Sequence, residues 1–368
     1  MSLPGRKPSK IEDSDLLLMP FRTDDVRIRG IRELTPPVEI LKEFQPTEEL
    51  TRQVHDTRVL LHEIIHGRSP RLVVVVGPCS IHDVDAAIDY AGRLQEIAKP
   101  FDGQLLTLMR VYFEKPRTTV GWKGLINDPT LDESFNINEG IRRARKLLLD
   151  LAKMGLMSAT EFLDMITPQY IADLIVWGAI GARTTESQSH RQLSSGMSCP
   201  VGFKNGTDGN VRIAIDAIRA ARETHHFLSV TKTGHAAIVE TNGNPDCHLI
   251  LRGGKLPNFD EESVSSALDT LRAQKLPDRL MVDCSHANSL KHAANQAIVS
   301  DSIAEQIEAG QAGIFGVMIE SNIVAGRQDL VPGKPLTFGQ SITDECIDLP
   351  ATERMLERLA EACLKARS

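Results

Sequence analysis

RLVVVVG, residues 71–77, is a short apolar run in which four valines follow one another. A β-branched run without regular polar alternation is typical of a strand buried on both faces of a parallel sheet. Seven more candidate strands follow: LLTLMRV (105–111), MSATEF (157–162), AIGAR (179–183), PVGFK (200–204), HLILRG (248–253), RLMVDCSH (279–286) and GIFGVMIE (313–320).

Longer segments with helical spacing of apolar residues separate these runs, for example 84–98, 139–155 and 210–223. Strands that alternate with helices predict βαβ units and a parallel sheet. Eight strands favour a closed barrel over an open, doubly wound sheet, and no GxGxxG follows the first strand. The sequence therefore predicts an α/β protein built on a (β/α)8 (TIM) barrel.

Two segments lie outside this alternation. Residues 1–70 contain a polar N-terminal extension and, from about 37, apolar residues at helical spacing, so we expect them to precede a catalytic barrel at 71–368. Between Phe227 and Asn242, two short apolar runs flank the sequence KTGH. This pattern predicts a β-hairpin inserted between barrel strands five and six.

Composition and charge disfavour several classes of protein. A net charge of −7 without a long run of Lys or Arg argues against a nucleic-acid partner. No stretch is long and apolar enough to predict a transmembrane helix or a membrane partner. The six cysteines form no CxxC and no disulfide-like framework, so we expect a reducing, cytoplasmic location.

Polar residues that could bind a ligand or act in catalysis lie at or near the end of each predicted strand. In chain order they are Cys79, Arg110, Glu161, Arg183, Lys204, Arg252, His286 and Glu320. In a TIM barrel these positions meet at the face that carries the active site. The four cations of this set, joined by Lys115, would repel one another without a bound anion. Arginine forks and lysine charges suit carboxylate and phosphate, so we predict a ligand that carries both groups.

The other strand-end residues offer metal ligands. Cys79, His286 and Glu320 belong to this group, and Asp344 lies further along the chain. A thiolate, an imidazole and two carboxylates suit a divalent transition metal such as Mn, Fe, Co or Zn. Taken singly, Cys79 is equally well a small buried apolar residue, and His286 a hydrogen-bonded histidine. The predicted metal site therefore depends on the barrel bringing four distant positions together.

Seven segments resemble one enzyme family. They are GPCSIHD (77–83), MRVYFEKPRTTVGWKG (109–124), GARTTESQ (181–188), PVGFKNGTDG (200–209), LRGG (251–254), DCSHAN (283–288) and GVMIESN (316–322). The chain is similar to 3-deoxy-D-arabino-heptulosonate 7-phosphate (DAHP) synthase, in the alpha branch of type I, from about residue 24 to near the C-terminus. The KPRT motif at 115–118 is specific for this activity within the wider group of related barrels.

The resemblance implies a metal-dependent, aldol-like condensation of phosphoenolpyruvate with D-erythrose 4-phosphate and water. The products are DAHP and phosphate, and the reaction is the first step of the shikimate pathway. The implied metal ligands are Cys79, His286, Glu320 and Asp344, the same four as above. The implied phosphoenolpyruvate ligands are Arg110, Lys115, Arg183, Lys204 and Arg252, with Glu161 nearby. Erythrose 4-phosphate would be held by Arg117, Thr118 and Asp344.

Catalytic roles follow from this assignment. We expect Lys115, Glu161, Arg183 and Lys204 to act in the reaction. Lys115 would donate a proton to the alkoxide that forms, with its pKa lowered by the surrounding cations. Glu161 and a metal-bound water remain alternatives for activating the attacking water.

The family resemblance also implies feedback inhibition by an aromatic amino acid at a second site. That site combines the third and fourth barrel helices, the inserted hairpin and the N-terminal segment of a neighbouring subunit. The matching residues are Asp24, Asp25, Asp164, Pro168, Gln169, Leu193, Ser198, Phe227, Ser229 and Val239. Ser198 favours phenylalanine over tyrosine or tryptophan as effector. Residues 1–70 would then serve regulation and the contacts of a homodimer or homotetramer.

Three other functions stay open at this stage. A 3-deoxy-octulosonate 8-phosphate synthase, which uses arabinose 5-phosphate, shares the barrel but is shorter and lacks KPRT. A non-catalytic barrel that senses an aromatic amino acid is less favoured, because all the proposed catalytic residues are present. A different metal-dependent aldolase would not need so many phosphate-binding cations.

Overall fold

The computed structural model describes residues 23–117, 119, 121–331 and 333–367, and the chain divides into two compact units, Met1–Leu34 and Thr35–Ser368. In the described part of the first unit, Asp25 adopts a positive φ of 53° and its carbonyl accepts a hydrogen bond from Ile28. The second unit contains the barrel together with helices α1 (Pro37–Glu43) and α2 (Glu48–Ile65). The second compact unit therefore begins before these two helices, at Thr35, whereas the sequence predicts that the barrel domain begins after them, at residue 71.

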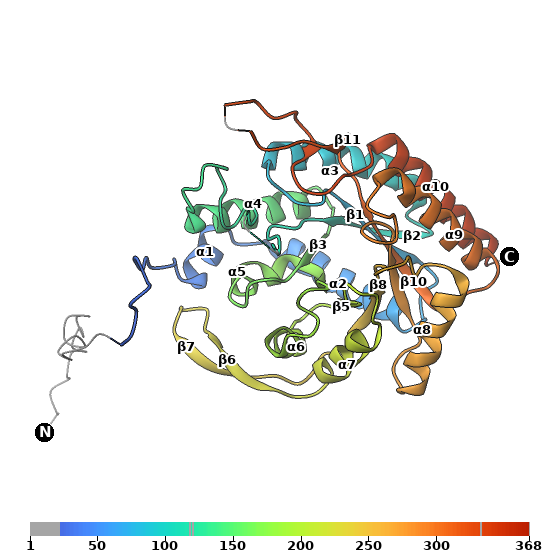
Figure 1. Ribbon diagram of the computed structural model, residues 1–368, viewed down its shortest axis with the longest axis horizontal. Coiled ribbons are helices and arrows are strands. Elements are labelled where there is room, and N and C mark those ends of the chain that lie inside the picture. Colours follow the sequence, from blue (N-terminus) through green and yellow to red (C-terminus); the bar gives the residue numbers. More distant parts are fainter. Residues whose placement is uncertain (1–22, 118, 120, 332, 368) are drawn as a thin grey trace, which may run out of the picture. The chain divides into compact units, whose positions relative to one another are not determined.

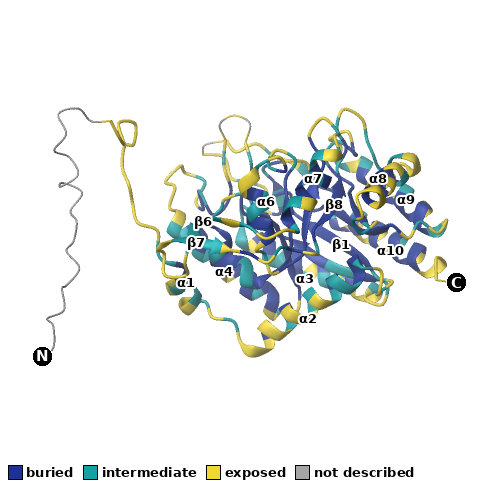
Figure 2. Cartoon of the chain, turned by 90° about the horizontal axis from the view of Figure 1, so that it is seen from below, coloured by how far each residue is buried: buried dark blue, intermediate teal, exposed yellow. Residues whose placement is uncertain are grey.

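Eight parallel strands close into a barrel in the order β1-β10-β9-β8-β5-β4-β3-β2, which confirms the predicted fold. The strands are β1 (Leu72–Gly77), β2 (Leu105–Arg110), β3 (Ser158–Glu161), β4 (Ile175–Ile180), β5 (Val201–Lys204), β8 (His248–Leu251), β9 (Leu280–Asp283) and β10 (Ile314–Glu320). Val73 of β1 pairs with Leu106 on one side and with Gly316 on the other. Both faces of β1 and β8 are buried, as the dark blue strands in Figure 2 show. Burial on both faces explains the continuous valine run in β1.

Helices follow the barrel strands and cover them. They are α3 (Val84–Ala98), α4 (Ile137–Lys153), α5 (Pro168–Ile171), α6 (Gln188–Ser195), α7 (Arg212–Ala221), α8 (Glu261–Ala273), α9 (Gln296–Glu308) and α10 (Leu349–Lys365). Short 3-10 helices lie at Lys99–Phe101, Ala172–Leu174 and Ala293–Asn295. Side-chain caps fix several of the helix starts: Asp83 accepts from Ala86 at α3, and Asp260 accepts from Ser263 at α8. Helices α9 and α10 pack against each other beside β10 (Figure 1).

Three barrel strands differ from their predicted bounds by two residues or more at one end or both, and the other five agree to within one residue. The sequence predicts the fourth strand at 179–183, but β4 is Ile175–Ile180, because the apolar run before Ala179 is itself completely buried. Arg183 consequently lies three residues beyond its strand. Strands β8 and β9 likewise end earlier than predicted, at Leu251 and Asp283. At β9 the chain turns because the Asp283 carboxylate accepts a hydrogen bond from the Ser285 amide, so Asp283 is the strand-end residue.

The predicted hairpin is present between β5 and β8. Strands β6 (His226–Val230) and β7 (Ala236–Glu240) pair antiparallel, with Phe227 opposite Val239 (yellow in Figure 1). Its tip is attached to the barrel unit, because Lys232 donates to the Gln169 carbonyl at 2.5 Å and accepts from the Val38 amide at 2.7 Å.

A second small sheet follows β10. Strands β11 (Val324–Arg327) and β12 (Gln340–Ser341) pair with each other, and Gly326 forms an isolated bridge with Cys346. Ile347 forms a bridge with Ser321, and its amide donates to the Glu320 carbonyl, so the segment that carries Asp344 lies against the end of β10. Among the described residues, no helix is long and apolar enough to cross a membrane.

Candidate active site

A cavity of about 800 Å³ lies at the C-terminal ends of the barrel strands. Eight of the predicted site residues line it: Lys115, Glu161, Arg183, Lys204, Arg252, His286, Glu320 and Asp344. They come from or follow seven different strands, which is the usual construction of a TIM-barrel site. The fold therefore brings together most of what the strand ends predict.

Three of the predicted metal ligands form a compact group. The Cys79 thiol and one carboxylate oxygen each of Glu320 and Asp344 all lie within 4.8 Å of one another. His286 is close by, with Nε2 4.0 Å from Glu320 Oε1. Burial, reinforced by the charge of Glu320, raises the pKa of the Cys79 thiol to about 11. A bound metal ion displaces the proton of a thiol that coordinates it. A thiolate together with two carboxylates is a donor set that fits a divalent transition metal.

The orientation of His286 also fits a metal ligand. Its Nδ1 lies 2.9 Å from Asp283 Oδ2 and 2.6 Å from Ser285 Oγ. A proton on Nδ1 satisfies these acceptors and leaves the lone pair of Nε2 on the side of Glu320. His286 also has a positive φ of 59°, an uncommon backbone conformation that its loop has to hold.

Asp283 is the main site residue that sequence reasoning missed. It is fully buried and, besides His286, it pairs with Lys204, whose Nζ lies 2.8 Å from Asp283 Oδ2. Burial alone would raise the pKa of Asp283, but the charges and hydrogen bonds of His286 and Lys204 hold it well below its usual value. One carboxylate thus orients both a predicted metal ligand and a predicted substrate cation. Its position at the end of β9 was the available signal, but the strand was predicted to run on to 286.

Arg110 takes a different place from the other cations. Its side chain is completely buried and donates to Glu320 at 2.8 Å and to the carbonyls of Pro78 and Cys79. It is not among the described residues that line the cavity. Arg110 therefore positions Glu320 and the Cys79 backbone in this structure, and its role as a phosphoenolpyruvate ligand stays a prediction.

Lys115 lies directly on the metal-ligand group. Its Nζ donates to Cys79 Sγ at 3.2 Å and to the Cys79 carbonyl at 3.3 Å. Burial and Arg110 act to lower the pKa of Lys115, but the negative charges of Cys79, Glu320 and Asp344 outweigh them and raise it. The expected lowering by neighbouring cations is therefore wrong for this structure, because the nearest charged partners are anionic.

Two polar atoms at the cavity lack a hydrogen-bond partner among the described residues: Glu161 Oε1 and Arg252 Nε. Both are buried, and leaving such groups unpaired costs free energy unless a ligand or water satisfies them. The Arg252 backbone is fixed by Asn205, which accepts from its amide at 2.8 Å. Gly181 lies close against Glu161: a Cβ at residue 181 would be only 2.6 Å from Glu161 Oε1, so this position leaves no room for a larger residue. These atoms are suited to contact a bound polar ligand.

The KPRT motif is only partly at the cavity. Lys115 and Pro116 line it, whereas Arg117 is exposed and donates to the Trp122 carbonyl at 2.8 Å. Arg117 is not among the described lining residues, and Thr118 lies outside the described residues.

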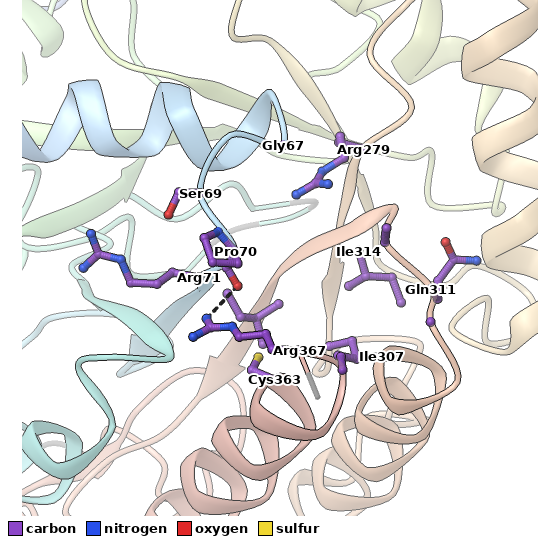
Figure 3. A pocket seen from close by; sticks show the side chains of 14 residues that line it. Gly67, Ser69, Pro70, Arg71, Arg279, Ile307, Gln311, Ile314, Cys363 and Arg367 are labelled. Atoms are coloured by element: carbon purple, nitrogen blue, oxygen red, sulfur yellow. Dashed lines mark hydrogen bonds between the residues drawn. The ribbon is translucent and has the colours of Figure 1, made fainter.

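A second cavity, of about 280 Å³, lies at the opposite end of the barrel (Figure 3). It begins beside Leu72 and Ile314, the first residues of β1 and β10, and Arg367 closes one side by donating to the Pro70 carbonyl at 2.9 Å. The described residues that line it include no histidine and no carboxylate. The chemistry predicted from the strand ends therefore belongs to the larger cavity.

A family model described as the DAHP synthetase I family matches residues 45–357. The chain belongs to the DAHP synthetase I family. It is 56% identical to the Phe-sensitive phospho-2-dehydro-3-deoxyheptonate aldolase of Escherichia coli (strain K12), over 95% of this chain and 99% of that protein. It is 52% identical to the Trp-sensitive enzyme of the same strain, over 93% of this chain and 98% of that protein.

A solved structure gives the same result for this member of the DAHP synthetase I family. The phospho-2-dehydro-3-deoxyheptonate aldolase of Francisella tularensis SCHU S4 aligns with a TM-score of 0.91 and 53% identity. The alignment covers 93% of this chain and 100% of that one. The predicted family and the observed barrel therefore agree.

Proposed function

We propose that the protein is a DAHP synthase, which condenses phosphoenolpyruvate with D-erythrose 4-phosphate and water to give DAHP and phosphate. The observation that carries this function is a single cavity in which a cation cluster meets the Cys79, Glu320 and Asp344 group. The high identity to named phospho-2-dehydro-3-deoxyheptonate aldolases over nearly the whole chain supports the same reaction. It does not favour the octulosonate synthase or the non-catalytic barrel.

The metal would be held by Cys79, His286, Glu320 and Asp344. When bound, it supplies Lewis-acid polarisation of the aldehyde carbonyl of erythrose 4-phosphate. The compact thiol and carboxylate group, and the Nε2 of His286 on the side of Glu320, support this assignment. The donor set admits Mn, Fe, Co or Zn, and thiolate and imidazole ligands make Mg a poor fit.

Phosphoenolpyruvate would bind to the cations that line the cavity, namely Lys115, Arg183, Lys204 and Arg252, with Arg110 behind them. Its carboxylate and phosphate match the planar forks of the arginines and the point charges of the lysines. The buried Lys204–Asp283 pair supports this role, because Asp283 fixes the ammonium in one place before the substrate arrives.

In the reaction, C3 of phosphoenolpyruvate forms a bond to the aldehyde carbon, and the aldehyde oxygen takes up a proton. Water adds at C2, and phosphate leaves as the C2–O bond breaks. Lys115 holds a proton on Nζ at the edge of the metal-ligand group, so it is suited to protonate the aldehyde oxygen. Glu161, with an unpartnered buried oxygen, is the protein group best suited to accept a proton from the water.

Erythrose 4-phosphate would be bound by Arg117, Thr118 and Asp344. Arg117 has to turn from the Trp122 carbonyl toward the cavity in order to reach a phosphate there. Its exposed position in a loop permits such a movement.

An aromatic amino acid would inhibit the enzyme, as the Phe-sensitive and Trp-sensitive names of the relatives state for those proteins. We place the effector with the ten residues named from the sequence, and phenylalanine is the first choice. Phe227, Ser229 and Val239 share one half-buried face of the hairpin. The bond from Lys232 to Gln169 supports the grouping of hairpin and α5. Asp24 and Asp25 would come from a neighbouring subunit of a homodimer or homotetramer.

A phosphate-release assay tests this function. We expect turnover with erythrose 4-phosphate, little turnover with arabinose 5-phosphate, loss of activity with EDTA, and recovery with Mn²⁺. Each aromatic amino acid is then added in turn, and phenylalanine should inhibit most strongly. Preferred use of arabinose 5-phosphate, or undiminished activity in EDTA, would contradict the proposal.

A further inference from the structure

A second cluster of histidine and carboxylate side chains lies at the other end of the barrel. His62 lies in the last turn of α2, His66 is the C-cap residue of that helix, and Asp246 lies two residues before β8. His62 Nδ1 is 2.7 Å and His66 Nε2 is 2.9 Å from the same oxygen, Asp246 Oδ1. The three ligand atoms lie within 4.8 Å of one another. We propose that His62, His66 and Asp246 form a second binding site for a divalent ion such as Zn²⁺.

The helix places the two histidines for this task. They are four residues apart, so both rings lie on one face of α2, and their centroids are 4.4 Å apart. The sequence HEIIH (62–66) has the spacing of the HExxH motif, in which two histidines on one helix face bind zinc. The third ligand, Asp246, is 180 residues further along the chain, so only the fold brings it to this pair.

Asp246 is held in position by its own neighbours. Its amide donates to Asn244 Oδ1 at 3.0 Å, and the buried Asn244 side chain donates to the carbonyls of Ser194 and Cys199. The carboxylate is thus fixed relative to the barrel, while α2 supplies the histidines. A site with rigid supports on both sides loses little conformational freedom when the ion binds.

The distances require only a small adjustment. Zinc bonds of about 2.1 Å in a tetrahedral site keep the ligand atoms roughly 3.4 Å apart. The two short contacts to Asp246 are hydrogen bonds, in which each contacting ring nitrogen carries a proton. Before that nitrogen can bind the ion, its proton has to move to the other nitrogen of the same ring. Neutral histidine exchanges its tautomers in this way without a change in charge. The side chains are 17 to 38% exposed, so water can fill the remaining coordination positions.

The site fits binding and not hydrolysis. In HExxH enzymes the glutamate acts as a general base. Here both carboxylate oxygens of Glu63 accept from Arg68, at 2.7 and 2.9 Å. The ion would instead join α2 to the start of β8, two segments separated by 180 residues or more. A bond between them would stabilise the end of the barrel remote from the catalytic cavity.

Cobalt and zinc binding to the full-length protein tests the proposal. Metal-free protein is titrated with Co²⁺, and bound equivalents are counted by equilibrium dialysis. We expect two equivalents per chain. The site with Cys79 has a thiolate ligand and gives a charge-transfer band in the near ultraviolet, whereas the His62 site has no thiolate and gives none. The two sites are therefore distinguishable in one titration.

Variants separate the two sites. His66→Gln and Asp246→Asn should each lose one equivalent and keep the thiolate band, and Zn²⁺ should no longer raise their melting temperature through this site. Cys79→Ser should lose the band and keep one equivalent. His55→Gln is the matched control, since His55 is an exposed histidine on the same helix. It should keep both equivalents.

A wild type that binds only one equivalent, with the thiolate band, or two equivalents that survive in both His66→Gln and Asp246→Asn, would overturn the proposal. If Asp246→Asn fails to fold, His62→Gln replaces it, because His62 is more exposed than Asp246. Absence of the thiolate band would count against the catalytic metal site alone.

Discussion

Asp283→Asn is the most informative change to the catalytic site, because one buried carboxylate contacts both Lys204 and His286. The substitution conserves volume but removes the charge that faces Lys204, whose side chain is only 3% exposed. Removing one partner of a buried ion pair costs about 3–5 kcal/mol, so we expect the melting temperature to fall by roughly 4–7 °C. Asparagine also loses the negative charge that holds the Nδ1 proton of His286.

The effect on the metal should be separate from the effect on stability. Loss of a carboxylate behind a ligating histidine typically weakens metal binding by about 10- to 100-fold, or about 1.4–2.7 kcal/mol. Competition with a chromogenic chelator measures this affinity, and initial rates at saturating metal measure the KM for phosphoenolpyruvate, which should rise. Asp173→Asn is the control, because Asp173 pairs with the buried Arg145 at 2.7 Å and is not among the described residues that line the cavity. It should lower stability without changing metal affinity. A folded Asp283→Asn protein with metal affinity and KM within twofold of wild type would refute this reasoning.

Three further predictions address the proton donor, a buried carboxyl group and the cavity wall. Lys115→Ala should lower kcat by about 10²- to 10⁴-fold, the usual contribution of a general acid, and near-normal turnover in the phosphate-release assay would exclude that role. Burial, with help from Asp164, raises the pKa of Glu114 from 4.5 to about 7, so the folded state holds this proton more tightly than the unfolded chain. The free energy of unfolding should therefore fall by up to about 3 kcal/mol as the pH rises from 4.5 to about 7. Urea titrations at pH 5 and pH 8 measure this fall, and Glu114→Gln should remove it. Equal pH dependence in both proteins would contradict this prediction. Gly254→Ala would place a Cβ 2.1 Å from the Gly209 amide nitrogen, which forces apart two loops at the cavity. We expect about a 10²-fold loss of kcat/KM, whereas Gly103→Ala, with no atom within 4 Å of its Cβ, should have no effect.

Much of the barrel could be predicted from local patterns. The valine run of β1 and the alternation of strand and helix depend on neighbours in the chain, so they are visible without tertiary structure. The same is true of the hairpin between Phe227 and Asn242. The bounds of β4 were predicted less well. The predicted strand at 179–183 overlaps β4 by only two residues, and the complete burial of Ile175–Ile180 shows where the strand lies.

The site residues divide in the same way. Strand-end positions predict that Cys79, Lys204, Glu320 and their partners meet, because a closed parallel barrel brings all its carboxyl ends to one face. Their individual contacts were not predictable. Arg110 lies behind Glu320 instead of lining the cavity, and Lys115 has a raised pKa instead of a lowered one.

The sequence by itself determined the fold class, the family and the types of side chain that surround the cavity. Tertiary structure decided which charges touch, as in the pairing of Asp283 with Lys204 and His286, and of Asp246 with His62 and His66. The physical reason is one of range. Periodicity and strand-end position are local properties of the chain, whereas an ion pair or a pKa depends on burial and on distances of a few ångströms between residues that are mostly far apart in sequence.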